Sequence, residues 1–299
     1  MPEGRTRVEI PSNLMSLEYW YLFPVSIGVA TLAMASGIGG AVFFSPIFIL
    51  WLRLEPTVAI GIALITELFG FSSGLVAYVR AQLVDYRLGA NLLMFSIPGA
   101  IVGVLSADLF PAIVLKTIFA VGLMFIGLQL FLSWRQEQKE AMDELIRVEG
   151  EEGYRSELTD RAGNTYRYTV CNKALGRTFA AVGGAFLGMI SVGLAELQEY
   201  HLVARCKVPS PVAVATSIFV VVITVLVASV GHVYGFIEEG GGDALQETVN
   251  VAMFTVPGVL IGGQLGPRVQ ARVNPDKMKV LISWIFMAVG AFMLSTLLS

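Results

Sequence analysis

The sequence predicts an all-α polytopic membrane protein with about eight transmembrane segments, arranged as two four-segment repeats with glycine-rich broken or re-entrant elements. The first observation is composition: 55% of the residues are hydrophobic and 14% are charged, whereas about 25% charged residues is typical of soluble domains. The mean hydropathy is +0.71. The second is that apolar residues fall in runs of about 20, the length that crosses a bilayer. The third is that short motifs recur in the same order in both halves.

The apolar runs form two groups of four with a polar stretch between them. They cover about 19–52, 57–79, 90–110, 112–133, 177–205, 210–236, 248–266 and 278–298. The chain therefore divides into a polar N-terminal segment (1–18), a first repeat (19–133), a hydrophilic insert (134–176) and a second repeat (177–299). Within the insert, "EEGYRSELTDRAGNTYRYTVCNK" alternates around "DRAGN", which predicts a small, solvent-exposed β-hairpin.

Two of the eight runs contain helix-breaking residues. The run at 19–52 is interrupted by "ASGIGGAVFFSP", whose glycines loosen a helix and whose proline ends one. The run at 177–205 is interrupted by "ISVGLAE". We interpret both as broken or re-entrant elements, because irregular backbone is tolerated at membrane depth only where protein or a cavity surrounds it.

The recurrence of motifs indicates an internal duplication. "IPGAIVGVL" begins at Ile97 and "VPGVLIGGQL" at Val256, while Gly39 in the first break aligns with Gly193 in the second. Two-repeat membrane folds are typical of transporters, with substrate bound where the repeats meet. Glycines four residues apart also predict close helix packing; these pairs are Gly70 with Gly74, Gly99 with Gly103, Gly184 with Gly188, and Gly258 with Gly262.

The same stretches resemble a known family. "SGIGGAVFFSP" followed by "PTVAIGIALITELFGFSSGLVAY" resembles the opening of the sulfite exporter TauE/SafE family of permeases, and "VGLAELQEYHLVARCKVPSPVAVATSIFVV" repeats that plan in the second half. The halves differ in detail, since Ile62 and Ala63 stand where Thr216 and Ser217 stand later, and Leu194 replaces the glycine that matches Gly40. The resemblance implies transport of small sulfur-containing anions such as sulfite, sulfonates or sulfoacetate.

An anion inside this protein would have to be held without a cationic side chain. Every Lys and Arg maps to a segment end or a polar loop. The remaining donors are backbone N–H groups at the N-termini of broken helices, where the helix dipole favours anions, and hydroxyl groups. The hydroxyls of Thr216 and Ser217 could equally bond back to their own helix. The substrate-binding candidates are Gly37, Gly39, Gly40, Ser191, Gly193, Thr216 and Ser217.

Three carboxylates lie inside apolar segments. Glu67 is near the middle of the second run, and Glu196 and Glu199 follow the second break, one helical turn apart. An ionised acid at the centre of a membrane helix costs about 2.5–3.5 kcal/mol, so Glu67 and Glu196 are either protonated for much of the cycle or bind a cation. Glu199 is a weaker candidate for proton coupling, because it lies closer to the interface or to a water-filled vestibule. A protonated Glu196 or Glu67 that carries the coupling proton is our hypothesis; the alternative is a protonated side chain that only hydrogen-bonds between helices.

Histidine and cysteine provide no second site in the sequence. His201 and His232 lie near segment ends and are expected to be solvated, although a proton-relay role is open. Glu199 and His201 face apart on a helix, which disfavours a metal site with Glu196. Cys171 and Cys206 provide neither a disulfide framework nor metal-ligand spacing. If all eight runs cross fully, the basic residues of the short connections and those of the insert favour opposite orientations.

The predicted function is therefore a proton-coupled secondary transporter of small, sulfur-containing anions. The alternatives are a cation- or proton-coupled transporter of a non-anionic substrate and a non-transporting membrane scaffold. No catalytic triad, nucleotide loop or zinc motif indicates an enzyme, and we expect no cofactor or metal. The expected partners are the anion, protons and membrane lipid, but not nucleic acid, because basic residues are scattered. The expected location is multi-pass in a cell membrane, the bacterial inner membrane.

Overall fold

The computed structural model describes residues 17–36, 39–107, 109–143, 154–238, 242–270 and 275–298. The helices of the first half are α1 (Leu22–Ser36), α2 (Ala41–Pro46), α3 (Pro56–Arg80), α4 (Tyr86–Ala107) and α5 (Ala112–Asp143). Those of the second half are α6 (Lys173–Ile190), α7 (Leu194–Glu199), α8 (Ser210–Glu238), α9 (Gly242–Gln270) and α10 (Pro275–Leu298). The 3-10 helix η1 (Leu17–Tyr19) precedes α1, and the π-helices η2 (Ile47–Trp51) and η3 (Tyr200–Arg205) extend α2 and α7.

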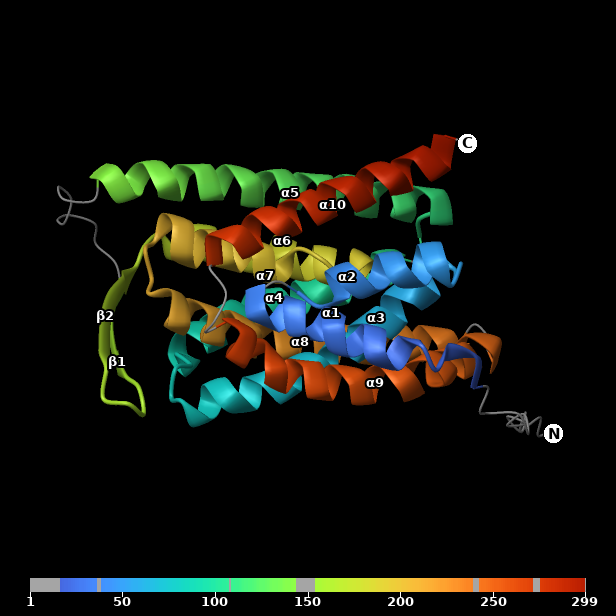
Figure 1. The fold of residues 1–299 in the computed structure, drawn as a ribbon, viewed down its shortest axis with the longest axis horizontal. Helices are drawn as coiled ribbons and strands as arrows, with labels where there is room; N and C mark the ends of the chain where they lie inside the picture. The colour runs from blue at the N-terminus through green and yellow to red at the C-terminus, as the bar shows by residue number, and fades with distance from the viewer. Residues whose placement is uncertain are drawn as a thin grey trace, which may run out of the picture.

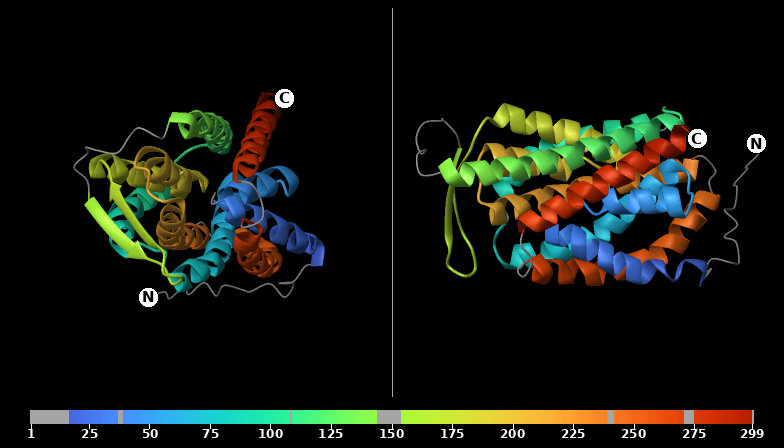
Figure 2. Two further views of the ribbon diagram at one scale, coloured as in Figure 1. Left: turned by 60° about the vertical axis from the view of Figure 1, so that its left-hand side comes forward. Right: turned by 45° about the horizontal axis from the view of Figure 1, so that its top comes forward.

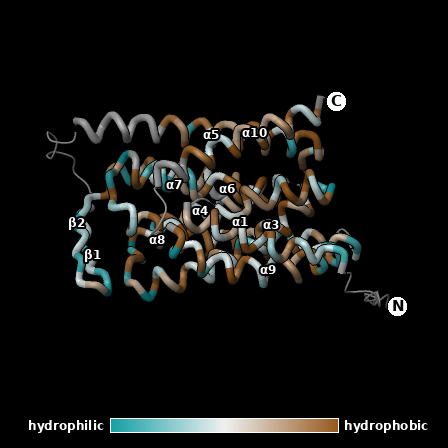
Figure 3. The backbone as a smooth tube through the Cα atoms, in the orientation of Figure 1, coloured by the Kyte–Doolittle hydropathy of each residue, from teal (hydrophilic) through white to brown (hydrophobic). Residues whose placement is uncertain are grey.

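An all-α, multi-pass membrane protein is confirmed (Figure 1). Among the described residues, α3, α4, α5, α8, α9 and α10 are long and apolar enough to cross a membrane. The first and fifth predicted segments are instead each divided into shorter helices, at the two glycine-containing breaks. Hydrophobic residues follow the helices, while hydrophilic residues gather at their ends and on the hairpin (Figure 3).

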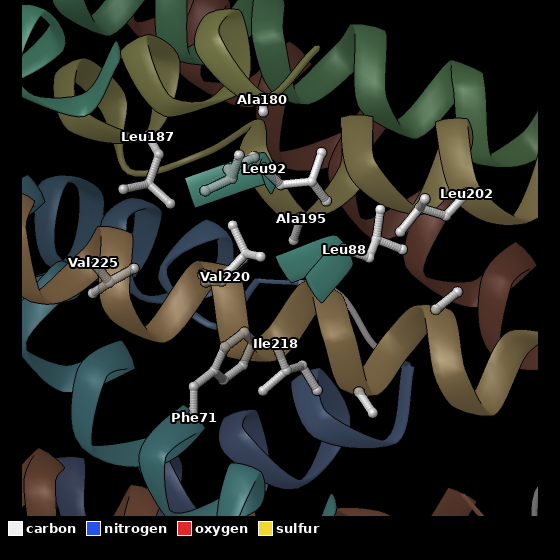
Figure 4. Close-up of a cluster of buried hydrophobic side chains, with 14 of the residues drawn as sticks. Phe71, Leu88, Leu92, Ala180, Leu187, Ala195, Leu202, Ile218, Val220 and Val225 are labelled. Carbon is white, nitrogen blue, oxygen red and sulfur yellow. The ribbon is translucent and has the colours of Figure 1, made fainter. Parts of the chain in front are cut away.

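The helices α3 and α8 form the centre of the bundle. In each, 67% of the apolar stretch is buried, against 28% in α10. They pack on one another, α3 also packs on α9, and α8 also packs on α4. Outside them α1 packs on α9, α6 on α4, and α5 on α10. Side chains from α3, α4, α6, α7 and α8, among them Phe71, Leu92 and Val220, meet in a buried apolar cluster (Figure 4).

The glycine pairs of α4 and α6 allow their backbones to touch. A Cβ at Gly103 would collide with the carbonyl oxygen of Ala185, and one at Gly188 would collide with that of Ala100. Close approach of this kind is what small residues at four-residue spacing permit in membrane helices.

The two ends of the bundle carry different elements. We call the end that holds the β-hairpin, the α3–α4 connection and the start of α8 the hairpin end (Figure 1). The opposite end, which we call the terminal end, holds the start of α1, the end of α10 and the α4–α5 connection (Figure 1; Figure 2, right). The two breaks in the chain start from opposite ends, and the charges at the two ends bear on the orientation of the protein.

The predicted β-hairpin is present, with most of its described residues exposed to solvent and part of β2 docked on the bundle. Strands β1 (Tyr154–Thr159) and β2 (Thr165–Val170) pair antiparallel. The side chain of Tyr168 is buried, and its hydroxyl donates to Oδ2 of the buried Asp85 at 2.8 Å. Cys171 and Cys206 form a disulfide, although no disulfide was expected from two cysteines 35 residues apart.

Candidate functional site

The first break turns the chain back inside the bundle. Helix α1 runs inward from the terminal end, and α2 with η2 returns toward that end (Figure 1). Gly39 and Gly40 are buried and directly precede α2, which starts at Ala41. Gly37 lies outside the described residues. The backbone N–H groups at the start of α2 therefore lie within the protein, as the sequence predicts for this break.

The second break has the same form but starts from the hairpin end. Helix α6 runs inward and ends at Ile190, and α7 with η3 returns (Figure 1). Gly193 has a φ of +115°, a backbone conformation that side chains with a Cβ strongly disfavour. Its N–H donates to Oε2 of Glu196 at 3.0 Å. The carboxylate thus caps the N-terminus of its own helix, where the dipole favours negative charge.

A hydroxyl pair joins the two breaks. Oγ of Ser45, in α2, lies 2.6 Å from Oγ of Ser191, and both serines are buried. The Ser191 hydroxyl also bonds to the carbonyl of Ile190. Ser191 was a sequence candidate, whereas Ser45 was missed; the signal for it is a polar residue between aromatic residues and the proline in "FFSP".

Two of the predicted carboxylates converge on Gly39. A Cβ placed there would lie 3.0 Å from Oε1 of Glu67 and 3.5 Å from Oε1 of Glu196. Glu67 is 2% exposed and Glu196 is 6% exposed. The residues come from α3 and α7, in different halves of the chain. The structure therefore brings together two acids that the sequence could only place in separate segments.

The partners of these carboxylates are backbone N–H groups. Those of Gly40 and Ala41 interact with Glu67, and those of Gly193 and Gly39 interact with Glu196. One oxygen of each carboxylate, Oε2 of Glu67 and Oε1 of Glu196, has no hydrogen-bond partner. Within the described part of the chain neither acid is in an ion pair. Two buried carboxylates thus face each other without a cation. The carboxylate of Glu67 lies at the start of α2, and that of Glu196 lies at the start of α7.

A small void lies beside Glu67. It measures about 10 Å³ and is bounded by residues that include Gly40, Thr66, Gly70 and Val259. A void of this size is at the lower limit for a single water molecule. The void beside Glu67 is therefore too small to hold an anion without local rearrangement.

The other predicted site residues have different surroundings. The Thr216 hydroxyl accepts the N–H of Asp85 at 3.0 Å and so belongs to the hairpin end. Ser217 is buried, and its hydroxyl has no partner. Glu199, at the end of α7, is only half-buried. Gln198, missed in the sequence, is 1% exposed, with both of its amide atoms unpartnered; a glutamine between two glutamates in an apolar segment was the available signal.

Both histidines are buried, contrary to the expectation that they are solvated. Nε2 of His232 lies 2.8 Å from the carbonyl oxygen of Gly188, and the side chain borders a cavity of about 430 Å³ whose lining also includes Glu55, Asp243 and Glu247. His201 lies in η3, with Nε2 3.7 Å from Sγ of Cys206. The described residues contain no group of three or more His, Cys, Asp or Glu side chains arranged to hold a metal ion.

Comparison with known proteins gives the family. A family model described as sulfite exporter TauE/SafE matches residues 22–293. The chain is 25% identical over 284 residues to the probable membrane transporter protein YunE of Bacillus subtilis, covering 92% of this chain and 96% of the relative. It is 23% identical over 277 residues to the probable membrane transporter protein YjnA of the same organism, covering 88% and 94%. No solved structure matches significantly. The chain belongs to the sulfite exporter TauE/SafE family and is a multi-pass transporter of the cell membrane.

Proposed function

We propose that this chain is a secondary transporter of small, sulfur-containing anions, coupled to protons through Glu67 and Glu196. The observation that carries the proposal is the meeting of two buried carboxylates, one from each half, at the N-termini of two short helices. The family match sets aside the non-transporting scaffold.

The packing of the helices supports a two-repeat transporter. When α1–α5 are exchanged in order with α6–α10, the pairing of α1 with α9 becomes that of α6 with α4, and the pairing of α3 with α9 becomes that of α8 with α4. The halves also begin at opposite ends of the bundle (Figure 1). We infer an inverted repeat with two re-entrant breaks and six full crossings. In such folds, one repeat moves against the other around a site at their interface.

The contacts of the carboxylates suggest how a proton and an anion are linked. The N–H groups of Gly40 and Ala41 interact with Glu67, and that of Gly193 binds Glu196. These are the groups expected to bind a substrate anion, so an ionised carboxylate competes with the substrate for the same donors. Protonation removes the carboxylate charge and frees these donors for the substrate. Proton and anion binding are then mutually favourable, which is the coupling that proton–anion symport requires.

The substrate class comes from the family. The matched model is described as a sulfite exporter, and the names of the two relatives state transport without a substrate. Sulfite, thiosulfate and sulfoacetate are therefore the first candidates, with sulfate and chloride as comparison anions.

The test combines binding with flux. Purified protein would be unfolded thermally at pH 5.5 and 7.5 with each anion, where a ligand at about 100 times its Kd stabilises by about 2.7 kcal/mol. We expect a sulfur anion to stabilise more at pH 5.5. Glu196→Gln should remove that dependence, and Glu67→Gln should weaken it. Glu238→Gln, at an exposed position at the end of α8, is the matched control and should behave as the wild type.

Flux into proteoliposomes completes the test. An inward proton gradient should accelerate uptake of the anion that stabilises the protein, and Glu196→Gln should abolish that acceleration. Equal stabilisation and equal flux at both pH values in wild type and Glu196→Gln would contradict proton coupling. Failure of every anion to stabilise the protein or to be transported would contradict the substrate class.

A second function is favoured by the same geometry. Two unpaired carboxylate oxygens near one point are also suitable cation ligands. In that case a monovalent cation would stabilise the protein, and a gradient of that cation rather than of protons would drive flux.

A further inference from the structure

Basic residues are concentrated at one end of the bundle. In the described chain, the short connections and adjoining helix ends at the hairpin end carry seven basic residues: Arg80, Arg87, Arg205, Lys207, Arg268, Lys277 and Lys279. The terminal end carries Arg53 and Lys116. It also carries acidic residues, among them Glu55, Glu238 and Asp243.

This distribution follows from the two breaks. If the first and fifth segments crossed fully, Arg53 and Lys116 would share an end with Arg205 and Lys207. Because each of these segments turns back (Figure 1), the connections fall at different ends, and most basic residues of the described short connections lie at the hairpin end. Short connections rich in Lys and Arg face the cytoplasm. The charges therefore place the hairpin end on the cytoplasmic side.

The disulfide lies at this same end. Cys171 directly follows β2, and Cys206 directly follows η3. Cytoplasmic thiols are kept reduced, and disulfides found there are typically transient and redox-sensing. A permanent structural disulfide is thus at odds with the charge distribution, whereas a reversible one agrees with it.

The bond connects the site to the hairpin. Cys206 ends the continuous stretch of α7 and η3 that carries Glu196. On the other side, the hairpin is fixed to the first half of the chain: Tyr168 and Ser156 donate to Asp85, and the N–H of Arg161 donates to the carbonyl of Ala81 at 3.0 Å. With the bond closed, the element bearing Glu196 is tied through the hairpin to the α3–α4 connection.

The surroundings of Cys206 suit thiol–disulfide exchange. Nε2 of His201 is 3.7 Å from its Sγ, and Arg205 and Lys207 flank it in sequence. Histidine and cationic neighbours favour the thiolate, which is the leaving group and the attacking group in exchange. Cys171 is half-buried, which leaves part of the pair accessible.

We propose that Cys171 and Cys206 form a reversible thiol–disulfide site on the cytoplasmic end, and that closing it slows transport. Two thiols of a cytoplasmic reductant donate two electrons and two protons to the bond, giving two cysteine thiols and the oxidised disulfide of that reductant. A small disulfide oxidant reverses the reaction. The closed form restrains movement of α7 and η3 relative to the first half. The effect on rate rests on the proposed transport function; the exchange site does not.

The location and redox state are tested by thiol labelling, since the chain has only these two cysteines. After reduction with dithiothreitol, a membrane-impermeant maleimide should label inside-out vesicles and not intact cells. In growing cells quenched with acid, the pair should be mainly dithiol, and it should close after treatment with diamide. Labelling from the outside would overturn the proposal and place the bond on the outer face. A disulfide that persists in untreated cells would also overturn it and make the bond a permanent structural link.

Transport tests the second part. In proteoliposomes, sulfite flux through oxidised protein should be at least three-fold slower than through reduced protein, and Cys206→Ser should match the reduced protein under both conditions. Cys171→Ser serves the same purpose if Cys206→Ser does not fold. Equal flux in both redox states would overturn the proposed control. If no anion is transported at all, the proposed function fails, while the labelling result still decides whether the exchange site exists.

Discussion

The contact between α4 and α6 gives a prediction whose size follows from the structure. Replacing Gly103 with alanine places a methyl group against the carbonyl oxygen of Ala185, with the N–H of Met189 3.0 Å away. These are backbone atoms that no side-chain rotation can move aside, so the helices must separate locally. Overpacking of this kind costs about 1–3 kcal/mol, and we take about 3 kcal/mol for a rigid backbone contact. Alanine recovers about 1 kcal/mol of helix propensity relative to glycine.

The net expectation for Gly103→Ala is a loss of about 2 kcal/mol in the free energy of unfolding, roughly a 30-fold fall in the ratio of folded to unfolded protein. The assay is denaturant or thermal unfolding of purified protein in detergent micelles, followed by tryptophan fluorescence. Gly28→Ala is the control, because a Cβ there meets no atom within 4 Å, and it should be neutral or slightly stabilising. Equal stability of Gly103→Ala and Gly28→Ala would refute the backbone contact.

Three further changes probe the site and the hairpin. Gly39→Ala inserts a methyl group 3.0 Å from Oε1 of Glu67, whose side chain can give way; we expect at least ten-fold slower anion flux with a melting temperature close to wild type, and unchanged flux would contradict the site. Gly193→Ala forces a Cβ into a φ of +115° and should cost about 1–2 kcal/mol, measured by thermal unfolding; a stability equal to wild type would mean that the break has another conformation. Tyr168→Phe removes the hydroxyl that donates to the buried Asp85, at a cost of about 1.5–3 kcal/mol, so limited trypsin digestion should cut the hairpin faster; an unchanged rate would indicate that the hairpin is held by other contacts.

Six of the helices were predictable from the sequence because hydrophobic length sets their position, whereas the predicted count of eight crossing segments is not confirmed. The runs beginning near 57, 90, 112, 210, 248 and 278 correspond to α3, α4, α5, α8, α9 and α10. The breaks were predictable as well, since "ASGIGGAVFFSP" and "ISVGLAE" contain glycines within otherwise apolar runs. The direction in which the chain leaves each break was not encoded in so local a signal, and orientation was therefore left open.

The remaining differences arise where tertiary packing decides the environment of a residue. His201 was expected at a solvated segment end, but η3 continues helically after α7 and packs the imidazole against Gly176 and Phe179. Thr216 was a candidate either for substrate binding or for a bond to its own helix, and the structure shows that its hydroxyl accepts the backbone N–H of Asp85. Cys171 and Cys206 carried no local signal, because a single disulfide depends on how the hairpin folds back onto η3.

The pairing of Glu67 with Glu196 illustrates why a repeat in sequence did not locate the site. The two acids do not occupy corresponding helices of the two halves, since Glu67 lies in α3 and Glu196 in α7. Both halves contain a break. In each half, the N–H groups at the start of the short helix contact one carboxylate. The two halves thus present N–H groups at matching breaks, and each half carries an acid at a different position. Because the two acids lie at unequal positions, Glu67→Gln and Glu196→Gln should differ in effect even though both acids approach the same glycine.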